Sequence, residues 1–409
     1  MQTNLASWVR DTPKGAEADA ILRRCVHCGF CTATCPTYQV LGDELDSPRG
    51  RIYLIKQMLE GETPTRATQQ HLDRCLTCRN CETTCPSGVE YGHLIDLGRE
   101  WVDQKVERPL RDRMRRATLR HALNAPWFAP LMRVGKRMRP LLPAALKRKV
   151  PAHRAAGALP DVRTHARQVY LLSGCVQPAM MPTIDAATIR VLDAIGIGAS
   201  YGLQKGCCGA INFHLDDGAA ALVQMRANID AWLPALESGK VEAIVMNASG
   251  CGAMVKDYAH HLRHDPVYAE LAKRLVGYVK DVAELVAPHA DELRGLMQTG
   301  GSVAFHPPCT LQHWQGLGGV TERMLVTLGF QSLPFSDKHL CCGSAGAYSV
   351  LQPEMSLTLR DRKLAAIAPT QADVIVSANV GCIGHLQSGT ETPVRHWIEW
   401  VDTRLVARP

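Results

Sequence analysis

Residues 25–36 read CVHCGFCTATCP and residues 75–86 read CLTCRNCETTCP, and these two stretches decide the architecture of the N-terminal part of the chain. Each contains four cysteines in the spacing C-x2-C-x2-C-x3-C, followed at once by proline. Three closely spaced thiolates wrap one corner of a cuboidal cluster, so the fourth ligand must come from elsewhere. The doubled run is typical of bacterial ferredoxins with two [4Fe–4S] clusters, in which the last cysteine of each run ligates the other cluster.

This pattern predicts two interleaved ligand sets. The first cluster is expected to take Cys25, Cys28, Cys31 and Cys85. The second cluster is expected to take Cys75, Cys78, Cys81 and Cys35. The alternative is a pair of zinc sites, but zinc prefers two CxxC pairs separated by a longer gap, which the doubled run fits poorly.

The segment between the two runs indicates which kind of ferredoxin this is. Residues 51–59 read RIYLIKQML, an amphipathic helical pattern for which a compact β-rich ferredoxin has little room. We therefore expect an α-helical ferredoxin domain. His27, inside the first run, has two interpretations: a hydrogen bond that tunes the cluster, or a solvated loop histidine, which we favour.

The C-terminal half contains an internal repeat that carries the other eight cysteines. Apolar runs at 169–172 and 302–305 predict strands that lead to Cys175 and Cys309. A Cys-Cys-Gly sequence follows at 207–209 and at 341–343, and further strands at 243–246 and 374–377 lead to Cys251 and Cys382. Helical stretches near 217–237 and 319–328 alternate with these strands, which indicates parallel α/β layers.

Each repeat offers four soft ligands of the kind that select iron–sulfur clusters or zinc. The second repeat supplies Cys309, Cys341, Cys342 and Cys382, and we expect a further cluster there. The first repeat supplies Cys175, Cys207, Cys208 and Cys251, and we rank it second. A scaffold with buried thiols and no metal remains the alternative for either copy. Among the histidines near these cysteines, His306 and His385 are better ligand candidates than His214, His313 and His339, although each singly is more typical of packing.

A basic segment joins the two halves. Residues 105–167 contain 17 lysines and arginines against three acidic residues, and seven prolines divide the segment into short helical pieces. Apolar residues such as Trp127 and Leu131 are interspersed with cations that include Lys147, Arg148 and Lys149. Two interpretations stand equal: an interfacial segment on an anionic membrane, or a linker that packs its apolar side on protein.

Several functions are disfavoured by what the sequence lacks. It has no Walker A loop, no GxGxxG between a strand and a helix, and no nucleophile elbow, so we expect no catalytic residues and no flavin on this chain. It also lacks a recognisable nucleic-acid-binding module, so no nucleic acid partner is expected. No apolar run near 18 residues and no export signal are present, which favours a cytoplasmic location with reduced thiols.

The predicted fold is α+β overall: an α-helical two-cluster ferredoxin domain is followed by two similar α/β Cys-Cys-Gly repeats. The expected domains are a ferredoxin domain at 1–102, a basic helical connector at 103–165, and the two repeats at 166–290 and 291–409.

Beyond these motifs, the chain resembles the iron–sulfur subunits of bacterial glycolate oxidase (glycolate dehydrogenase). The segments that carry the resemblance are MQTNL at 1–5, CVHCGFCTATCP at 25–36, LGDELD at 41–46, PRGRIYLIK at 48–56, TLQH at 310–313 and VRHWI at 394–398. The wider set that combines such a ferredoxin run with two Cys-Cys-Gly repeats includes one of the subunits of glycerol-3-phosphate dehydrogenase, lactate-utilisation proteins and heterodisulfide reductase.

The resemblance implies an electron-transfer subunit of an oxidoreductase. Its partners would be FAD-containing glycolate oxidase subunits, which oxidise glycolate to glyoxylate and pass electrons through this chain toward a quinone or another membrane acceptor. The chain would then be peripheral on the inner face of the cell membrane and inactive on substrate alone. Its cofactors would be two [4Fe–4S] clusters and one or two further iron–sulfur clusters.

Two alternatives remain. One is the equivalent subunit of a related lactate or glycerol-3-phosphate dehydrogenase. The other is a heterodisulfide-reductase-like catalyst, in which the last cysteine of each repeat belongs to a CxxC. Here Met254 and His385 stand at the second cysteine position, which argues against a five-cysteine cluster and disulfide cleavage.

Overall fold

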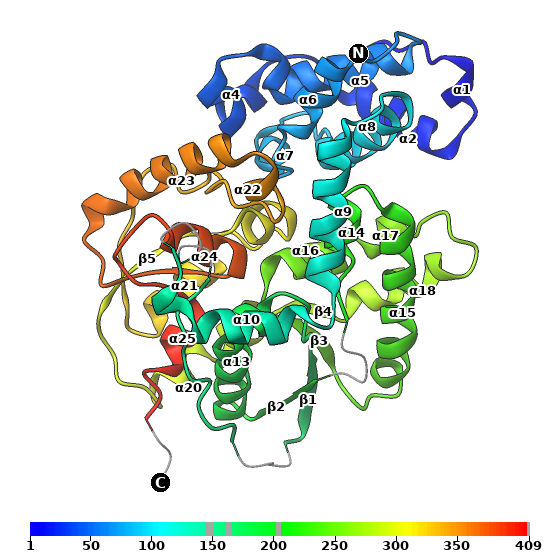
Figure 1. The fold of residues 1–409 in the computed structure, drawn as a ribbon. Helices are drawn as coiled ribbons and strands as arrows, with labels where there is room; N and C mark the ends of the chain where they lie inside the picture. Colours follow the sequence, from blue (N-terminus) through cyan, green and yellow to red (C-terminus); the bar gives the residue numbers. More distant parts are fainter. Residues whose placement is uncertain (144–146, 148–149, 161–164, 202–205, 407–409) are drawn as a thin grey trace. The chain divides into compact units, whose positions relative to one another are not determined.

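The computed structural model describes residues 1–143, 147, 150–160, 165–201 and 206–406, which form two compact units. The first unit comprises residues 1–116 and 337–363, and the second comprises residues 117–336 and 364–409. The boundary at residue 116 falls within helix α9 (Leu110–Asn124). Figure 1 shows the order of the elements along the chain.

The N-terminal part of the first unit is built from helices, as expected for an α-helical ferredoxin domain. In chain order these are α1 (Ser7–Arg10), α2 (Pro13–Arg24), α3 (Phe30–Ala33), α4 (Pro36–Leu41), η1 (Glu44–Asp46), α5 (Pro48–Leu59), α6 (Arg66–Asp73), α7 (Asn80–Thr84) and α8 (Tyr91–Lys105). Helices α4 and α5 begin with proline at the first helical position, where its missing N–H costs nothing. Pro36 thus starts a helix directly after the last cysteine of the first motif, and Pro48 starts the helix that follows η1.

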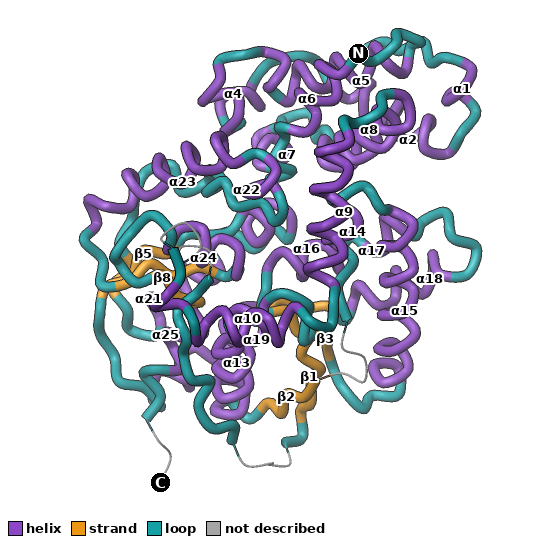
Figure 2. The backbone as a smooth tube through the Cα atoms, viewed as in Figure 1, coloured by secondary structure: helices purple, strands orange, loops and turns teal. Residues whose placement is uncertain are grey.

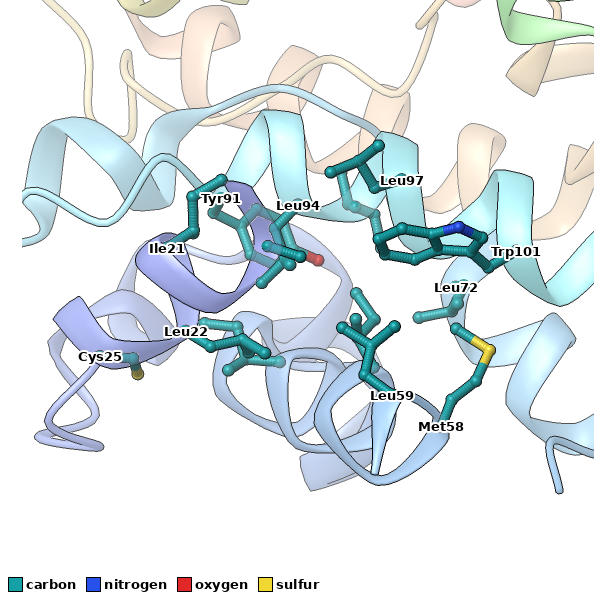
Figure 3. Close-up of a cluster of buried hydrophobic side chains, with 14 of the residues drawn as sticks. Ile21, Leu22, Cys25, Met58, Leu59, Leu72, Tyr91, Leu94, Leu97 and Trp101 are labelled. Carbon is teal, nitrogen blue, oxygen red and sulfur yellow. The ribbon is translucent and has the colours of Figure 1, made fainter. Parts of the chain in front are cut away.

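A single apolar cluster holds these helices together. Ile21 and Leu22 of α2, Leu59 of α5, Leu72 of α6 and Leu94 of α8 are all buried in it. Figure 3 shows these side chains meeting between the helices, with Trp101 and Met58 at one end and Cys25 at the other. The ligand loops therefore emerge from a packed helical core, which fixes the positions of their first cysteines.

The first unit also contains a segment from the second repeat. This segment includes Cys341, Cys342, α22 (Tyr348–Leu351) and the first part of α23 (Pro353–Ile367). Tyr348 Oη donates a hydrogen bond to the Arg74 carbonyl oxygen at 3.0 Å, and Asn80 Nδ2 donates one to the His339 carbonyl oxygen at 3.2 Å. Asn80 lies in the second ferredoxin motif and Arg74 directly precedes it, so both contacts hold the segment beside this motif.

The second unit contains two four-stranded parallel sheets, which Figure 2 shows as two separate groups of strands. The first sheet has the order β2-β1-β3-β4 and the second has the order β6-β5-β7-β8. The strands are β1 (Arg167–Leu171), β2 (Ile197–Tyr201), β3 (Ala243–Met246), β4 (Val279–Asp281), β5 (Ser302–Phe305), β6 (Gln331–Ser332), β7 (Val374–Ser377) and β8 (Val394–His396). The sheets have the same topology, which confirms the internal repeat.

Helices surround the sheets of the second unit. Those before and within the first repeat are α10 (Phe128–Arg137), η2 (Arg139–Leu141), α12 (Gln177–Met180), α13 (Pro182–Ala194), α14 (Ala210–His214), α15 (Gly218–Glu237), α16 (Ser249–Lys256), α17 (Tyr258–His261), α18 (Tyr268–Gly277) and α19 (Val282–Val286). After them come η3 (Ala287–His289), α20 (Ala290–Arg294), η4 (Thr310–Trp314), α21 (Val320–Thr327), η5 (Ala368–Thr370), α24 (Val380–Gln387) and α25 (Trp397–Asp402). The two repeats pack through α13 and α25, where Arg190 Nη2 lies 2.6 Å from an Asp402 carboxylate oxygen.

A cysteine follows the carboxyl end of each of four strands. Cys175 follows β1, Cys251 lies in α16 after β3, Cys309 follows β5, and Cys382 lies in α24 after β7. Each of these four strands occupies a central position in its sheet. The placement agrees with the rule that parallel α/β sheets collect ligand-binding groups beyond the carboxyl ends of their strands.

Candidate iron–sulfur sites

The two ferredoxin motifs share an unusual backbone. The first loop has positive φ at His27 (57°) and Gly29 (86°), and the second has positive φ at the equivalent Thr77 (48°) and Arg79 (57°). Left-handed residues in such a loop turn successive N–H groups toward one concave side, which favours an anion. Thr77 N already donates to Cys75 Sγ at 3.4 Å. The backbone therefore suits the negatively charged sulfur atoms of an iron–sulfur cluster.

The first expected ligand set is brought together in one pocket. This pocket is lined by Cys25, Cys28, Cys31 and Cys85, and Cys81 also reaches its wall. Burial, with a smaller contribution from the nearby Cys25, raises the pKa of the Cys31 thiol to about 11. A thiol in that condition gives up its proton when it binds a metal.

The second expected set forms around a buried thiol. Burial raises the pKa of Cys81 well above its usual value, and the thiols of Cys78, Cys75 and Cys35 lie near enough to add to the shift. Cys35 is also within range of Cys31 of the first set. The last cysteine of the first motif therefore lies with the three cysteines of the second motif, while remaining near its own loop.

A buried ionic network lies next to Cys35 and is connected to it through Thr37. Arg51 and Asp46 are 1 % and 0 % exposed, and their side chains form an ion pair at 3.1 Å. Asp46 also pairs with Arg74 at 3.0 Å. The Asp46 carbonyl oxygen accepts a hydrogen bond from Thr37 Oγ1 at 2.9 Å, and Cys35 Sγ lies 3.2 Å from the same hydroxyl oxygen.

This network was not expected from the sequence. The available signal was the position of Arg51, four residues before Ile55 on the apolar face of α5, where a cation must find a partner if it is buried. The partner, Asp46, stands five residues earlier in a different element, so spacing alone did not identify it.

The first repeat brings its four thiols together within the second unit. Cys175 Sγ and Cys207 Sγ are 3.6 Å apart. Cys208 forms side-chain hydrogen bonds with both Cys207 and Cys251. Hydrogen bonds from Cys175 and Cys208 hold the pKa of Cys207 well below its usual value. The four thiols, joined by these successive contacts, provide a complete donor set for a soft metal centre.

The Cys-Cys-Gly turn of the first repeat is held by buried polar groups. Asn228 Nδ2 donates to the Cys207 carbonyl oxygen at 3.0 Å, and Tyr258 Oη donates to the Cys208 carbonyl oxygen at 2.8 Å. Gly209 has φ of 93°, and its N–H donates to Cys207 Sγ at 3.4 Å. The turn thus presents both adjacent thiols on one side, as the Cys-Cys-Gly pattern requires.

The second repeat has the same turn. Gly343 has φ of 87° and its N–H donates to Cys341 Sγ at 3.4 Å, while Ser356 Oγ donates to the Gly343 carbonyl oxygen at 2.7 Å. Cys341 and Cys342 belong to the first unit, whereas Cys309 and Cys382 belong to the second. Three of these cysteines are buried and Cys382 is half-buried.

The histidines near the cysteines occupy different environments. His306 is fully buried at the end of β5, and Ser377 Oγ donates to its carbonyl oxygen at 2.9 Å. His385 and His313 are half-buried, whereas His214 and His339 are exposed. The His27 ring nitrogen Nε2 lies 2.9 Å from Met1 Sδ, so this ring packs against the N-terminal residue.

Comparison with known families agrees with this geometry. Residues 21–89 match the 4Fe-4S dicluster domain family, and residues 169–256 and 303–387 each match the cysteine-rich domain family. The chain is 51 % identical over 408 residues to the glycolate oxidase iron–sulfur subunit of Escherichia coli, with 99 % of both chains covered.

The chain belongs to the family of glycolate oxidase iron–sulfur subunits. It is also 31 % identical over 401 residues to the probable glycolate oxidase iron–sulfur subunit of Bacillus subtilis, with 90 % of this chain and 89 % of that one covered. Lactate utilization protein A of Bacillus licheniformis is 26 % identical over 224 residues, which is 53 % of this chain and 89 % of that protein.

Family membership confirms the resemblance and the prediction of an iron–sulfur electron-transfer subunit with an oxidoreductase role. The dicluster domain and the two cysteine-rich domains also confirm that the chain binds two or more iron–sulfur clusters. The predicted fold, a helical ferredoxin domain followed by two cysteine-rich α/β repeats, is confirmed as well. Among the residues that the structure describes, no helix is long and apolar enough to cross a membrane.

Proposed function

We propose that this chain carries electrons from a flavin-containing glycolate dehydrogenase toward a membrane quinone. The strongest support is the 51 % identity to the Escherichia coli protein along the whole chain. The chain also contains four groups of cysteine thiols and no flavin-binding motif in its sequence. Substrate oxidation would then take place on a partner subunit that holds FAD. The complex would lie peripherally on the inner face of the cell membrane, where the quinone is.

We propose that the ferredoxin clusters are held by the interleaved sets. Cys25, Cys28, Cys31 and Cys85 would hold one cluster, and Cys75, Cys78, Cys81 and Cys35 the other. The shared pocket of the first set and the proximity of Cys35 to Cys78 support this assignment. Such clusters supply one-electron transfer. The residues of this chain hold the thiolates in position, point N–H groups at the sulfur atoms and limit access of water.

We further propose one cluster in each Cys-Cys-Gly repeat. Cys175, Cys207, Cys208 and Cys251 already form mutual contacts, which supports the first repeat more strongly than its sequence did. Cys309, Cys341, Cys342 and Cys382 would form the equivalent set. The division into domains at 1–102, 103–165, 166–290 and 291–409 is part of the same proposal.

The test is reduction of the clusters by substrate. The chain is purified anaerobically with its flavoprotein partners, and glycolate is added while cluster reduction is followed by electron paramagnetic resonance. We expect reduction by glycolate in the complex and none by glycolate in the flavin-free isolated chain. Dithionite serves as the control that the clusters in the isolated chain are reducible.

The alternative substrates are tested in the same way. Faster reduction by lactate or by glycerol 3-phosphate than by glycolate would favour the related dehydrogenases. Reduction of the isolated, flavin-free chain by any of these hydroxy compounds would contradict the assignment of substrate oxidation to a partner.

A further inference from the structure

The basic connector presents an apolar stripe to solvent. Trp127, at the N-cap of α10, is followed by Leu131, Val134 and Met138 at intervals of four, three and four residues, so these side chains share one face. Their exposed fractions are 53 %, 59 %, 51 % and 49 %, and Leu141 in η2 is 80 % exposed. Large exposed apolar side chains are unremarkable singly, but a continuous row of them marks a surface that another body covers.

The opposite side of α10 is the one that packs on the unit. Lys136 is 7 % exposed, and its Nζ donates a hydrogen bond to the Ala179 carbonyl oxygen of α12 at 2.7 Å. Burial lowers the pKa of this lysine. Helix α10 therefore turns Lys136 toward α12 of the same unit and its apolar stripe away from α12, which disfavours the interpretation of the connector as a linker packed through this apolar stripe.

Cations accompany the stripe. Arg133 and Arg137 are exposed and each precedes a stripe residue by one position, so they lie along one edge of it. Arg137 also lines an open hollow of about 490 Å³, together with Lys136, Arg139, Pro140, Ala152 and His153, and the presence of Lys136 places this hollow toward the side of α10 that faces away from the stripe. Among the described residues that line the hollow, three are cationic and none is acidic, which adds to the positive charge of this part of the connector. Arg148 and Lys149, which the sequence also places in the connector, lie outside the described residues.

We propose that α10 and η2 form a surface that binds an anionic phospholipid bilayer. An amphipathic segment of this kind lies in the membrane interface with its apolar side chains among the acyl chains and its cations at the phosphates. Trp127 suits the interface because its ring is amphipathic. The exposed stripe supplies apolar area, and Arg133 and Arg137 along its edge meet the lipid phosphates.

Charge decides between a bilayer and an ordinary protein partner. The segment 105–167 carries 17 cations against three acids, whereas an apolar protein–protein interface is depleted of charge at its core. An anionic bilayer complements both features at once, because lipid phosphates meet the cations and acyl chains meet the stripe. The inference gives a physical route to the membrane acceptor of the proposed function, but it does not depend on the substrate.

The experiment is co-sedimentation of the anaerobically purified full chain with vesicles. We expect it to bind phosphatidylglycerol vesicles at low salt, to bind phosphatidylcholine vesicles poorly, and to be released by high salt. Arg133→Gln and Arg137→Gln should each weaken partitioning about fivefold, which is the equivalent of about 1 kcal/mol per cation near an anionic surface. Leu131→Gln and Val134→Gln should each weaken it about tenfold, because each removes an apolar side chain from the interface.

Matched controls come from the same unit. Val223→Gln in α15 changes an apolar side chain that is 62 % exposed, and Lys240→Gln removes an exposed cation outside the connector. Neither should alter vesicle binding. As a second readout, brominated lipid should quench part of the tryptophan fluorescence, and Trp127→Leu should abolish that quenching.

Three results would overturn the proposal. They are no binding to phosphatidylglycerol vesicles at low salt, binding unchanged by the stripe and cation variants, and loss of the flavoprotein partner from those variants with vesicle binding intact. The last result would assign the stripe to a protein interface. The first two results leave reduction of the clusters by glycolate in the complex unaffected, and the third removes it only in the variants and not in the parent protein, so failure here is distinct from failure of the proposed function.

Discussion

Gly209 and Gly343 occupy the same place in the two Cys-Cys-Gly turns, yet their surroundings differ. Both have positive φ, which favours glycine. A Cβ on Gly343 would lie 2.5 Å from the Ser356 carbonyl oxygen and 2.9 Å from Leu359 Cβ. A Cβ on Gly209 would lie 3.3 Å from the Ala221 carbonyl oxygen. The second turn is therefore pressed against α23, while the first has more room beside α15.

Alanine substitutions should separate these two environments. Gly343→Ala should lower the free energy of unfolding by about 3 kcal/mol, because left-handed strain and overpacking add together. Gly209→Ala should cost about 1–2 kcal/mol, mainly from the left-handed backbone. Gly218→Ala, where nothing lies within 4 Å and φ is ordinary, is the control and should be nearly neutral. Denaturant unfolding of the loaded chain measures all three, and equal losses for the two turns would contradict the argument.

The interleaved ligand assignment is also tested at single residues. Cys85→Ser should damage the cluster held by Cys25, because Cys85 lines the same pocket. Cys35→Ser should instead damage the cluster held by Cys75, because its thiol lies near Cys78. Electron paramagnetic resonance of the two reduced variants should therefore lose different signals. If Cys85→Ser removes the signal that is lost in Cys75→Ser, each motif binds its own cluster.

At the scale of elements, the buried network joins η1, α5 and the loop before Cys75. Arg51 of α5 and Arg74 both pair with Asp46, the last residue of η1. Asp46→Asn should cost about 3–5 kcal/mol, because it leaves the Arg51 charge buried without its counterion. Glu44→Gln is the control, since its ion pair with Arg49 is partly exposed and should contribute less than about 1 kcal/mol. Thermal unfolding measures the stability of both variants. If Asp46→Asn unfolds at the same temperature as the parent, the network does not stabilise the unit.

Apolar runs in the sequence identified the central strands of the two sheets but not the edge strands. The runs at 169–172, 243–246, 302–305 and 374–377 correspond to β1, β3, β5 and β7, and only β1 is displaced, toward Arg167. The other four strands were missed, and they are the edges of the two sheets. Central parallel strands are buried on both faces and become continuous apolar runs, whereas edge strands tolerate residues such as Lys280 and Arg395.

Two of the missed edge strands end in equivalent capping boxes. Asp281 and Glu284 cap α19 after β4, and His396 and Glu399 cap α25 after β8. Burial raises the pKa of Asp281 to about 7, with Lys256 lowering it and Glu284 raising it slightly. Burial lowers the pKa of His396 to about 3. Equivalent positions thus have opposite effects on how stability depends on pH.

The raised pKa of Asp281 makes the folded protein less stable as pH rises. The folded pKa lies above the unfolded value of 3.8, so the folded state holds a proton that the unfolded state loses, and stability falls as pH rises from about 4 to 7. Asp281→Asn removes this loss while an amide oxygen can still accept the Ala283 N–H. The variant should match the parent near pH 4 and exceed it at pH 8 by up to about 4 kcal/mol, from about three pKa units. Because both proteins retain His396, its opposite contribution cancels in the comparison, and equal melting temperatures at pH 8 would refute the shift.

At the scale of the whole molecule, the assignment of residues 337–363 to the first unit had no signal in the sequence. The repeat pattern associates Cys341 and Cys342 with Cys309 and Cys382. Their segment lies in the first unit through contacts between residues far apart in sequence, and the hydrogen bond from Tyr348 to Arg74 is one of these contacts. Such contacts have no periodicity, so a pattern of cysteines predicts the ligands but not the unit in which each one folds.

The number of clusters in the whole chain decides where electrons leave it. Two ferredoxin clusters account for about eight irons, and each filled Cys-Cys-Gly repeat would add about four if its cluster is of the same type. The contacts of Cys175, Cys207, Cys208 and Cys251 within one unit predict that the first repeat is filled. We therefore expect the anaerobically reconstituted full chain to hold at least about twelve irons.

Cys208→Ser should lower that number by about four without changing the ferredoxin signals, and Cys342→Ser should do the same if the second repeat is also filled. An iron content of about eight that neither variant changes would mean that both repeats are scaffolds with buried thiols, and that electrons leave the chain directly from the ferredoxin domain.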